Sequence, residues 1–257
     1  MNVWRVEAYR KAYSIALLGI TSIFAVYTVG QFSRQVLNVI SDGLFEFLGT
    51  LLFISAFTLA RRYRWQWKGV IPKVWIVAGF SAMFIFTAIT IQNMFKYTGL
   101  TSSHLQMTTI LFLLALCLAV YALSLYIKTF KEALRGKTVL TVATAIIFTG
   151  LASTYLVLQP LMSVQKYSIE GVLTATFIFI EFVLFYLAVM GICLFSGGRL
   201  AKAWFFLSLG IVLIMAGNLI VFYISATEIY TGLFGNMCIS SGLILTTLAF
   251  YIHRIEI

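Results

Sequence analysis

Residues 171–196 read GVLTATFIFIEFVLFYLAVMGICLFS, a run of 26 residues in which Glu181 is the single charged side chain. At about 1.5 Å per residue, a helix of this length reaches across the roughly 30 Å hydrocarbon core of a bilayer. Strands of a membrane β-barrel would instead show alternating stretches of about ten residues, and this run is longer and unbroken. The stretch therefore predicts a transmembrane helix.

The remainder of the chain has the same character. Of its 257 residues, 61% are hydrophobic and 10% are charged, whereas about 25% are charged in an ordinary soluble domain. No polar stretch is long enough to fold as a separate soluble domain. The sequence predicts an all-α integral membrane protein with eight transmembrane helices, at about 12–31, 43–60, 72–94, 106–127, 138–160, 171–196, 203–225 and 232–252.

The positive charges indicate how these helices cross the membrane. If the N-terminus is cytoplasmic, all of the 18 Lys and Arg residues except Arg34, Lys96 and Lys166 fall on the cytoplasmic side. This matches the rule that basic residues gather in cytoplasmic loops. The five tryptophans lie near the same boundary, and indole prefers the headgroup layer. We therefore expect a multi-pass protein of the cell membrane with both termini in the cytoplasm, and the net charge of +10 then gives no reason to expect nucleic-acid binding.

Four short matches in the same order suggest that the chain repeats itself. They are EAYR at 7–10 with EALR at 132–135, DG at 42–43 with EG at 170–171, KVW at 73–75 with KAW at 202–204, and YTGL at 97–100 with YTGL at 230–233. They predict two four-helix halves, 1–128 and 129–257, related as a tandem repeat. The alternative is that membrane boundaries recruit the same residue types wherever they occur.

An even number of spans in each half gives the two halves the same orientation, so their symmetry axis would run along the membrane normal. Parallel repeats of this kind occur in some transporters, where the binding site lies between the halves. A duplication of this kind can also be purely structural, with no central site.

Glu181 and Asn218 are the candidate ligand- or ion-binding residues, since both lie near the middle of a predicted span. An ionisable side chain at that depth costs about 2.5–3.5 kcal/mol on insertion scales. Burial favours the neutral acid, which could relay a proton, bind a cation or pair with a basic ligand. The aligned position in the first half lies at or beside Phe53, so the carboxyl group is not duplicated. A structural role, with Glu181 bonded to a neighbouring helix, remains open, and Asn218 is most simply read as an interhelical hydrogen bond.

Several polar residues lie at the predicted outer boundary. Glu46, Gln92, Asn93 and Asn236, with Tyr97 and Tyr230, could together line an outer vestibule. The commoner reading is that they are ordinary boundary residues.

The predicted cytoplasmic loops ARRYRWQWKGVIPK, at 60–73, and IKTFKEALRGK, at 127–137, mix basic and aromatic residues. Near a membrane surface, each basic residue adds roughly 1 kcal/mol of attraction to anionic headgroups. We expect these loops to contact lipid, or alternatively to dock a protein partner. The residues of this surface are Arg61, Arg62, Arg64, Trp65, Trp67, Lys68, Lys128, Lys131 and Arg135.

The sequence offers little support for catalysis or for a bound cofactor. His104 and His253 are predicted on opposite sides of the membrane, so they cannot share a metal or haem. The Cys, His, Asp and Glu residues show no zinc spacing, and the three cysteines lie in apolar segments. We therefore expect neither an enzyme nor a metal or cofactor site.

Two functions remain in view. One is a small-molecule or ion transporter, or a channel-like protein, with its site between the two halves. The other is a membrane sensor bundle or an accessory subunit that uses its basic loops to contact a partner, or that forms a homo-oligomer. The transporter predicts a polar cavity that reaches Glu181, whereas the sensor or subunit predicts a dry core.

Overall fold

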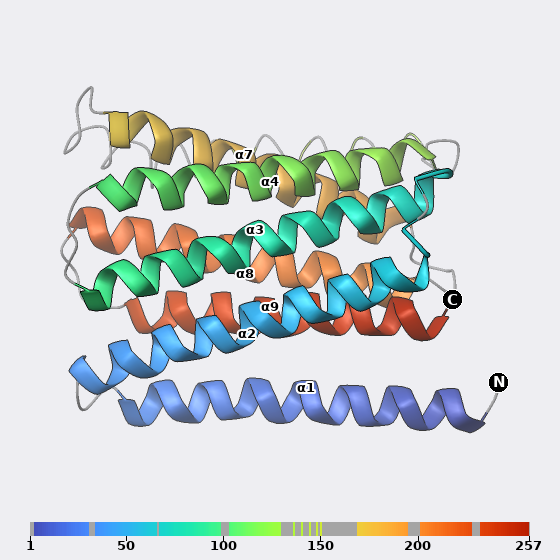
Figure 1. Cartoon of the computed structure of the whole chain (residues 1–257), viewed down its shortest axis with the longest axis horizontal. Helices are drawn as coiled ribbons and strands as arrows, with labels where there is room; N and C mark the ends of the chain where they lie inside the picture. Colours follow the sequence, from blue (N-terminus) through green and yellow to red (C-terminus); the bar gives the residue numbers. More distant parts are fainter. Residues whose placement is uncertain are drawn as a thin grey trace.

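The protein is described here from a computed structural model, which describes residues 3–30, 34–65, 67–98, 103–129, 169–194, 201–227 and 232–256 and the single positions 136, 140, 144, 148 and 150. Over these residues the chain is a bundle of long helices (Figure 1). The helices are α1 (Val3–Gly30), α2 (Arg34–Arg62), α3 (Val70–Thr98), α4 (Ser103–Thr129), α7 (Ile169–Leu194), α8 (Ala201–Thr227) and α9 (Gly232–Glu256).

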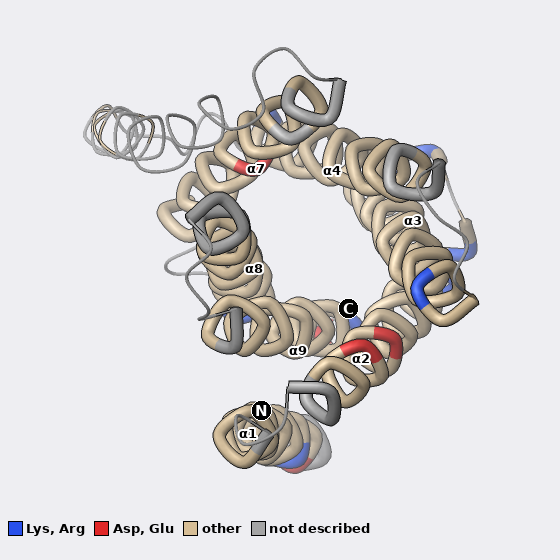
Figure 2. The backbone as a smooth tube through the Cα atoms, turned by 90° about the vertical axis from the view of Figure 1, so that its left-hand side faces the viewer, with Lys and Arg blue, Asp and Glu red and all other residues tan. Residues whose placement is uncertain are grey.

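Six of these helices form a closed ring, seen end-on in Figure 2. Around the ring, α2 contacts α3, α3 contacts α4, α4 contacts α7, α7 contacts α8, α8 contacts α9, and α9 returns to α2. Helix α1 lies outside the ring and packs mainly against α9. The first and last described residues lie at the same end of the bundle (Figure 1).

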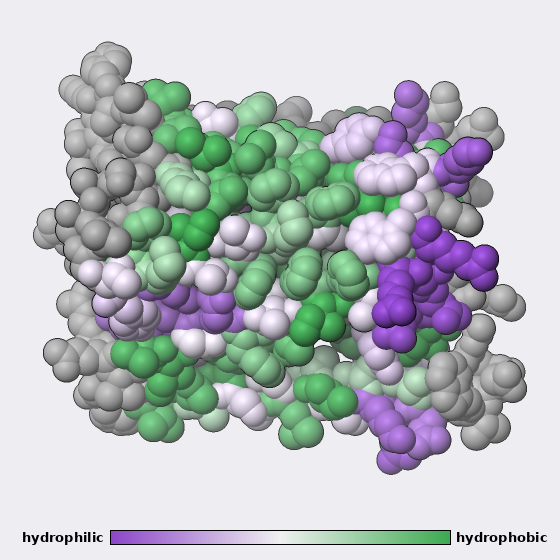
Figure 3. All heavy atoms as spheres, in the orientation of Figure 1, coloured by the Kyte–Doolittle hydropathy of each residue, from purple (hydrophilic) through white to green (hydrophobic). Residues whose placement is uncertain are grey.

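The outside of the bundle is apolar, unlike the surface of a soluble protein. On α1, Ile15, Leu17 and Leu18 are 70, 67 and 66% exposed, while the polar side chains of Glu181 and Ser208 are buried. Figure 3 shows a mainly hydrophobic face, with polar side chains gathered at the right-hand end and a smaller polar group toward the left-hand end. Within the described part of the chain, seven helices are long and apolar enough to cross a membrane. These are the properties of a multi-pass helical membrane protein.

Seven of the predicted spans correspond to described helices, each longer than the predicted span or close to it in length. The predicted fifth span, 138–160, lies outside the described residues except for positions 140, 144, 148 and 150. The helices extend beyond the apolar runs because the chain stays helical through the polar residues at each end. Arg61 and Arg62, for example, lie in the last turn of α2.

The structure adds a distinction among the tryptophans that the sequence does not show. Trp75 and Trp204 lie in the first two turns of α3 and α8, but each is only 1% exposed and packs inside the bundle. Trp65 and Trp67, at 39 and 54% exposure, do remain accessible at the bundle end, as expected for boundary residues. A tryptophan near a helix end can serve either purpose, and only the rotation of its helix decides between them.

Glycines bring α8 and α9 unusually close together. A Cβ atom added to Gly217 would lie 2.5 Å from the carbonyl oxygen of Gly235, and one added to Gly242 would lie 2.6 Å from that of Gly210. Two reciprocal glycine pairs thus let the helix backbones touch. Close approach of this kind provides the packing that holds helices together in lipid, where the hydrophobic effect does not.

The end of α2 carries a strained turn that presents basic side chains. Arg64 and Trp65 have φ angles of 53° and 52°, in the left-handed region that usually holds glycine. The backbone N–H of Trp65 donates to the carbonyl oxygen of Ala60 at 3.3 Å, and that of Arg64 to Arg61 at 2.9 Å. This is the Schellman pattern of a helix end. The indole of Trp65 packs edge-on against Phe57, with ring centroids 5.3 Å apart.

Candidate site at the centre of the helix ring

A cavity of about 120 Å³ lies within the ring, and all six ring helices contribute to its wall. Most of the lining side chains are apolar. Representative residues from the six helices are Leu52 of α2, Ala82 of α3, Leu123 of α4, Leu184 of α7, Ile211 of α8 and Phe250 of α9. A largely apolar wall with a few polar groups is typical of small-molecule sites. The transporter hypothesis predicted a polar cavity from the sequence, and the wall of the observed cavity is largely apolar.

Glu181 lines this cavity and is the acidic residue in its wall. Its side chain is 3% exposed. The carboxylate oxygen Oε1 accepts a hydrogen bond from Nδ2 of Asn218, across the contact between α7 and α8. The other oxygen, Oε2, is buried and has no hydrogen-bond partner among the described residues. The structure thus brings the two predicted site residues together and leaves one carboxylate oxygen available.

Two hydroxyl groups and an indole add further polarity to the wall. Ser81 Oγ donates to the carbonyl oxygen of Ala115 at 2.7 Å, and Thr246 Oγ1 donates to that of Gly242 at 2.9 Å. Their hydroxyl protons are therefore used within the protein, while their oxygens can still accept hydrogen bonds. Trp75 also lines the cavity, and its indole N–H has no acceptor within the described part of the chain.

An aromatic layer closes the bundle near the end that carries the termini. Trp75 stacks on His253 and Trp204 packs on Tyr126, in each case with ring centroids 4.1 Å apart. The two tryptophans also contact each other, at 6.1 Å. Tyr63 shares a hydrogen bond of 2.9 Å with Nε2 of His253. Residues from four ring helices, and Tyr63 after the end of α2, thus meet in one packed layer, and the two tryptophans of this layer also line the cavity.

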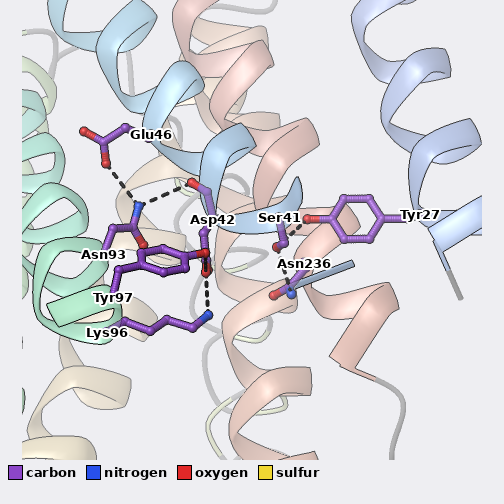
Figure 4. A network of polar contacts seen from close by, with 8 residues as sticks. All are labelled: Tyr27, Ser41, Asp42, Glu46, Asn93, Lys96, Tyr97 and Asn236. Carbon is purple, nitrogen blue, oxygen red and sulfur yellow. Dashed lines mark hydrogen bonds and ion pairs between the residues drawn. The ribbon is translucent and has the colours of Figure 1, made fainter. Parts of the chain in front are cut away.

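Four of the residues predicted to line an outer vestibule lie on α2 and α3, where polar side chains join the two helices (Figure 4). Asp42 forms an ion pair with Lys96 and accepts a hydrogen bond from the Tyr97 hydroxyl at 2.9 Å. Glu46 accepts from Asn93 at 3.1 Å and from Thr90 at 2.6 Å. These side chains pair with one another and join the two helices, while Gln92 is exposed on α3.

Asn236 belongs to a separate contact, also drawn in Figure 4. Its amide donates to Ser41 Oγ at 3.3 Å, and Ser41 shares a hydrogen bond of 2.8 Å with the Tyr27 hydroxyl. The contact links α1, α2 and α9. It lies next to the contacts of Asp42, because Ser41 and Asp42 are consecutive residues of α2, and Tyr230 lies outside the described residues.

Part of the predicted basic surface is described. Side chains at the end of α2 and in the following turn are exposed, as is Lys128 at the end of α4. Lys131 and Arg135 lie outside the described residues. The exposed members are Arg61, Arg62, Arg64, Trp65, Trp67, Lys68 and Lys128.

Sequence reasoning missed Ser81, Thr246 and the two cavity-lining tryptophans as parts of this site. Ser and Thr are frequent in membrane helices, and nothing local distinguishes those that face a cavity. The tryptophans did carry a signal, since Trp75 and Trp204 occupy matching positions of the repeat, but their position near the membrane boundary suggested another role.

Neither similarity to known proteins nor a cluster of metal-binding side chains assigns a function to this site. No known protein family, no curated protein and no solved structure was found to match this chain. Over the described residues, no group of three or more His, Cys, Asp and Glu side chains comes together that could hold a metal ion.

Proposed function

We propose that the chain is a small-molecule or ion transporter, or a channel-like protein, that binds its substrate at Glu181 between two four-helix halves. The observation that carries the proposal is the central cavity. Residues of both halves line it, and Glu181, the one carboxyl group among the described lining residues, has an oxygen without a partner in the described part of the chain. An intramembrane acid that faces a bundle interior is usually functional.

The arrangement of the ring supports the tandem repeat. Trp75 and Trp204 are matching positions in the sequence, and they contact each other inside the bundle. Trp75 of α3 also stacks on His253 of α9, and Trp204 of α8 packs on Tyr126 of α4, so each tryptophan contacts a ring from the other half. Coincidental recruitment to a membrane boundary does not explain two buried residues.

Trp75 and Trp204 are 129 residues apart in the sequence. The same interval aligns Asn218 with Ile89, whose side chain lies beside Gly49 of α2. The first half therefore has an apolar contact where the second half has the acid and its amide.

The direction of the helices supports an eighth span. Helices α4 and α7 are neighbours that run in the same direction, so Thr129 and Ile169 lie at opposite ends of the bundle (Figure 1). The positions described within 136–150 are helical. Both facts agree with a further crossing between α4 and α7, and with halves of four spans each.

The function is tested by flux into proteoliposomes. The probes are H⁺, Na⁺, K⁺ and isobutylamine, each measured against protein-free vesicles. Glu181→Gln keeps the shape of the side chain and removes its charge, so we expect flux of at least one probe in wild type and its loss by tenfold or more in the variant. Glu7→Gln, in an exposed ion pair with Lys11 on α1, is the matched control and should keep the flux.

Equal flux through wild type and Glu181→Gln, or no flux of any probe through wild type, contradicts the proposal. The second result would favour the other candidate, a membrane sensor or an accessory subunit. The observation in favour of that candidate is the exposed basic and aromatic turn after α2, which could contact a partner or anionic lipid.

The orientation with both termini in the cytoplasm is tested by labelling. In a chain whose three native cysteines are replaced by Ala, Arg62→Cys and Thr98→Cys place an exposed thiol at opposite ends of the bundle. A membrane-impermeant maleimide should label Thr98→Cys in intact cells, and Arg62→Cys only after permeabilisation. The reverse pattern would overturn the placement of the basic residues on the inner face.

A further inference from the structure

The central cavity combines a small apolar volume with an incomplete ionic contact. Glu181 is 3% exposed, and its Oε2 has no hydrogen-bond partner among the described residues. No Lys, Arg or His is among the described residues that line the cavity, so the protein supplies no counter-charge there. A buried carboxylate without a counter-charge is costly, and a bound cation would remove that cost.

The remaining polar groups favour a ligand that donates hydrogen bonds. The hydroxyl protons of Ser81 and Thr246 are bonded to backbone carbonyl groups, so these side chains offer the cavity an acceptor oxygen. Asn218 uses an N–H of its amide on Oε1 of Glu181, which orients the carboxyl group and leaves Oε2 as an acceptor. An ammonium group has three N–H donors and no acceptor, which suits such a set.

The apolar wall sets the size and character of the rest of the ligand. The cavity volume is about 120 Å³, somewhat smaller than an apolar cavity of about 150 Å³ that is known to take benzene. Side chains such as Leu184, Ile211 and Phe250 offer no hydrogen bonds. A hydrated inorganic cation would have to lose its water shell against this wall, whereas an aliphatic body would fit it without that cost.

We propose that the cavity binds a small aliphatic or cyclic primary amine in its protonated form, with the ammonium group on Oε2 of Glu181 and the hydrocarbon body against the apolar wall. The inference rests on the proposed function in one respect, because it names the class of substrate that the transporter would carry. Its physical basis is independent, because a sensor would bind the same ligand at the same place.

Isobutylamine and isobutanol form a matched pair of probes, with the same carbon skeleton and one heteroatom of different charge. Binding to purified wild-type protein in detergent is measured by isothermal titration calorimetry, with blank titrations into micelles. A charge-assisted hydrogen bond to a buried carboxylate favours the amine. We expect isobutylamine to bind at least tenfold more tightly than isobutanol.

Two variants locate the binding. Glu181→Gln should weaken isobutylamine binding at least tenfold and leave isobutanol binding unchanged, while Glu7→Gln, in an exposed ion pair on α1, should change neither. Comparison of the two probes on wild-type protein needs no variant, so it decides the question even if Glu181→Gln does not fold. Absence of isobutylamine binding, equal affinity for the two probes, or equal amine binding by folded Glu181→Gln overturns the inference.

The two proposals can fail separately. Glu181-dependent flux of H⁺, Na⁺ or K⁺ without isobutylamine binding would keep the transporter and reject the amine. Glu181-dependent amine binding without flux of any probe would keep the amine site and reject the transporter.

Discussion

Gly217→Ala is expected to destabilise the protein, although alanine normally stabilises a helix relative to glycine. The added Cβ atom would lie 2.5 Å from the carbonyl oxygen of Gly235 and 2.6 Å from a side-chain carbon of Ile239. Both neighbours belong to α9, and a backbone oxygen cannot rotate away. The two helices must therefore separate, and we expect a loss of about 2–3 kcal/mol, at the upper end of the usual cost of overpacking.

Gly43→Ala is the matched control, since a Cβ atom there meets nothing within 4 Å. Alanine in a helix is favoured over glycine by about 0.5–1 kcal/mol, so this variant should be as stable as wild type or more stable. The measurement is the fraction of protein that stays monodisperse after heating in detergent, across a range of temperatures. Similar shifts for both variants would mean that the α8–α9 glycine contact is not a determinant of stability.

The double variant Glu181→Leu/Asn218→Leu is expected to lose all Glu181-dependent flux while keeping or raising its thermal stability. Replacing both partners of a buried hydrogen bond by apolar groups is nearly neutral or stabilising, whereas removing one leaves the other unsatisfied at about 1–3 kcal/mol. Leu at both positions also removes an ionisable group from a membrane helix. A site kept for function at the expense of stability should behave in this way.

The single variant Asn218→Leu provides the comparison. It leaves Oε1 of Glu181 without its donor and should be less stable than both wild type and the double variant. A double variant that unfolds at a much lower temperature than wild type would instead identify the pair as an interhelical hydrogen bond that stabilises the bundle. That outcome would favour the structural reading of Glu181 over the functional one.

Seven of the eight predicted helices are found in the described residues, because lipid imposes a simple requirement on each segment. A run such as 171–196 must be helical and apolar over the bilayer thickness, whatever its neighbours are. The sequence placed Glu181 and Asn218 near the middle of two spans, but it could not show that they pair, because a sequence does not show how far α7 and α8 are rotated. The outer vestibule stays a prediction, and what the sequence could not show is that Glu46 pairs with Asn93 while Asn236 bonds Ser41.

The amino-acid sequence by itself determined that the chain forms long apolar helices and that an acid lies midway along one of them, because hydropathy and length are properties of single segments. Only the tertiary structure decided that six helices close into a ring and that Trp75 and Trp204 face inward. It also decided that Glu181 has an oxygen at the cavity wall with no partner among the described residues. In lipid, all faces of such helices are nearly equally apolar. Helix rotation and neighbours are therefore set by close contacts such as Gly217 with Gly235, which arise only when two distant segments pack together.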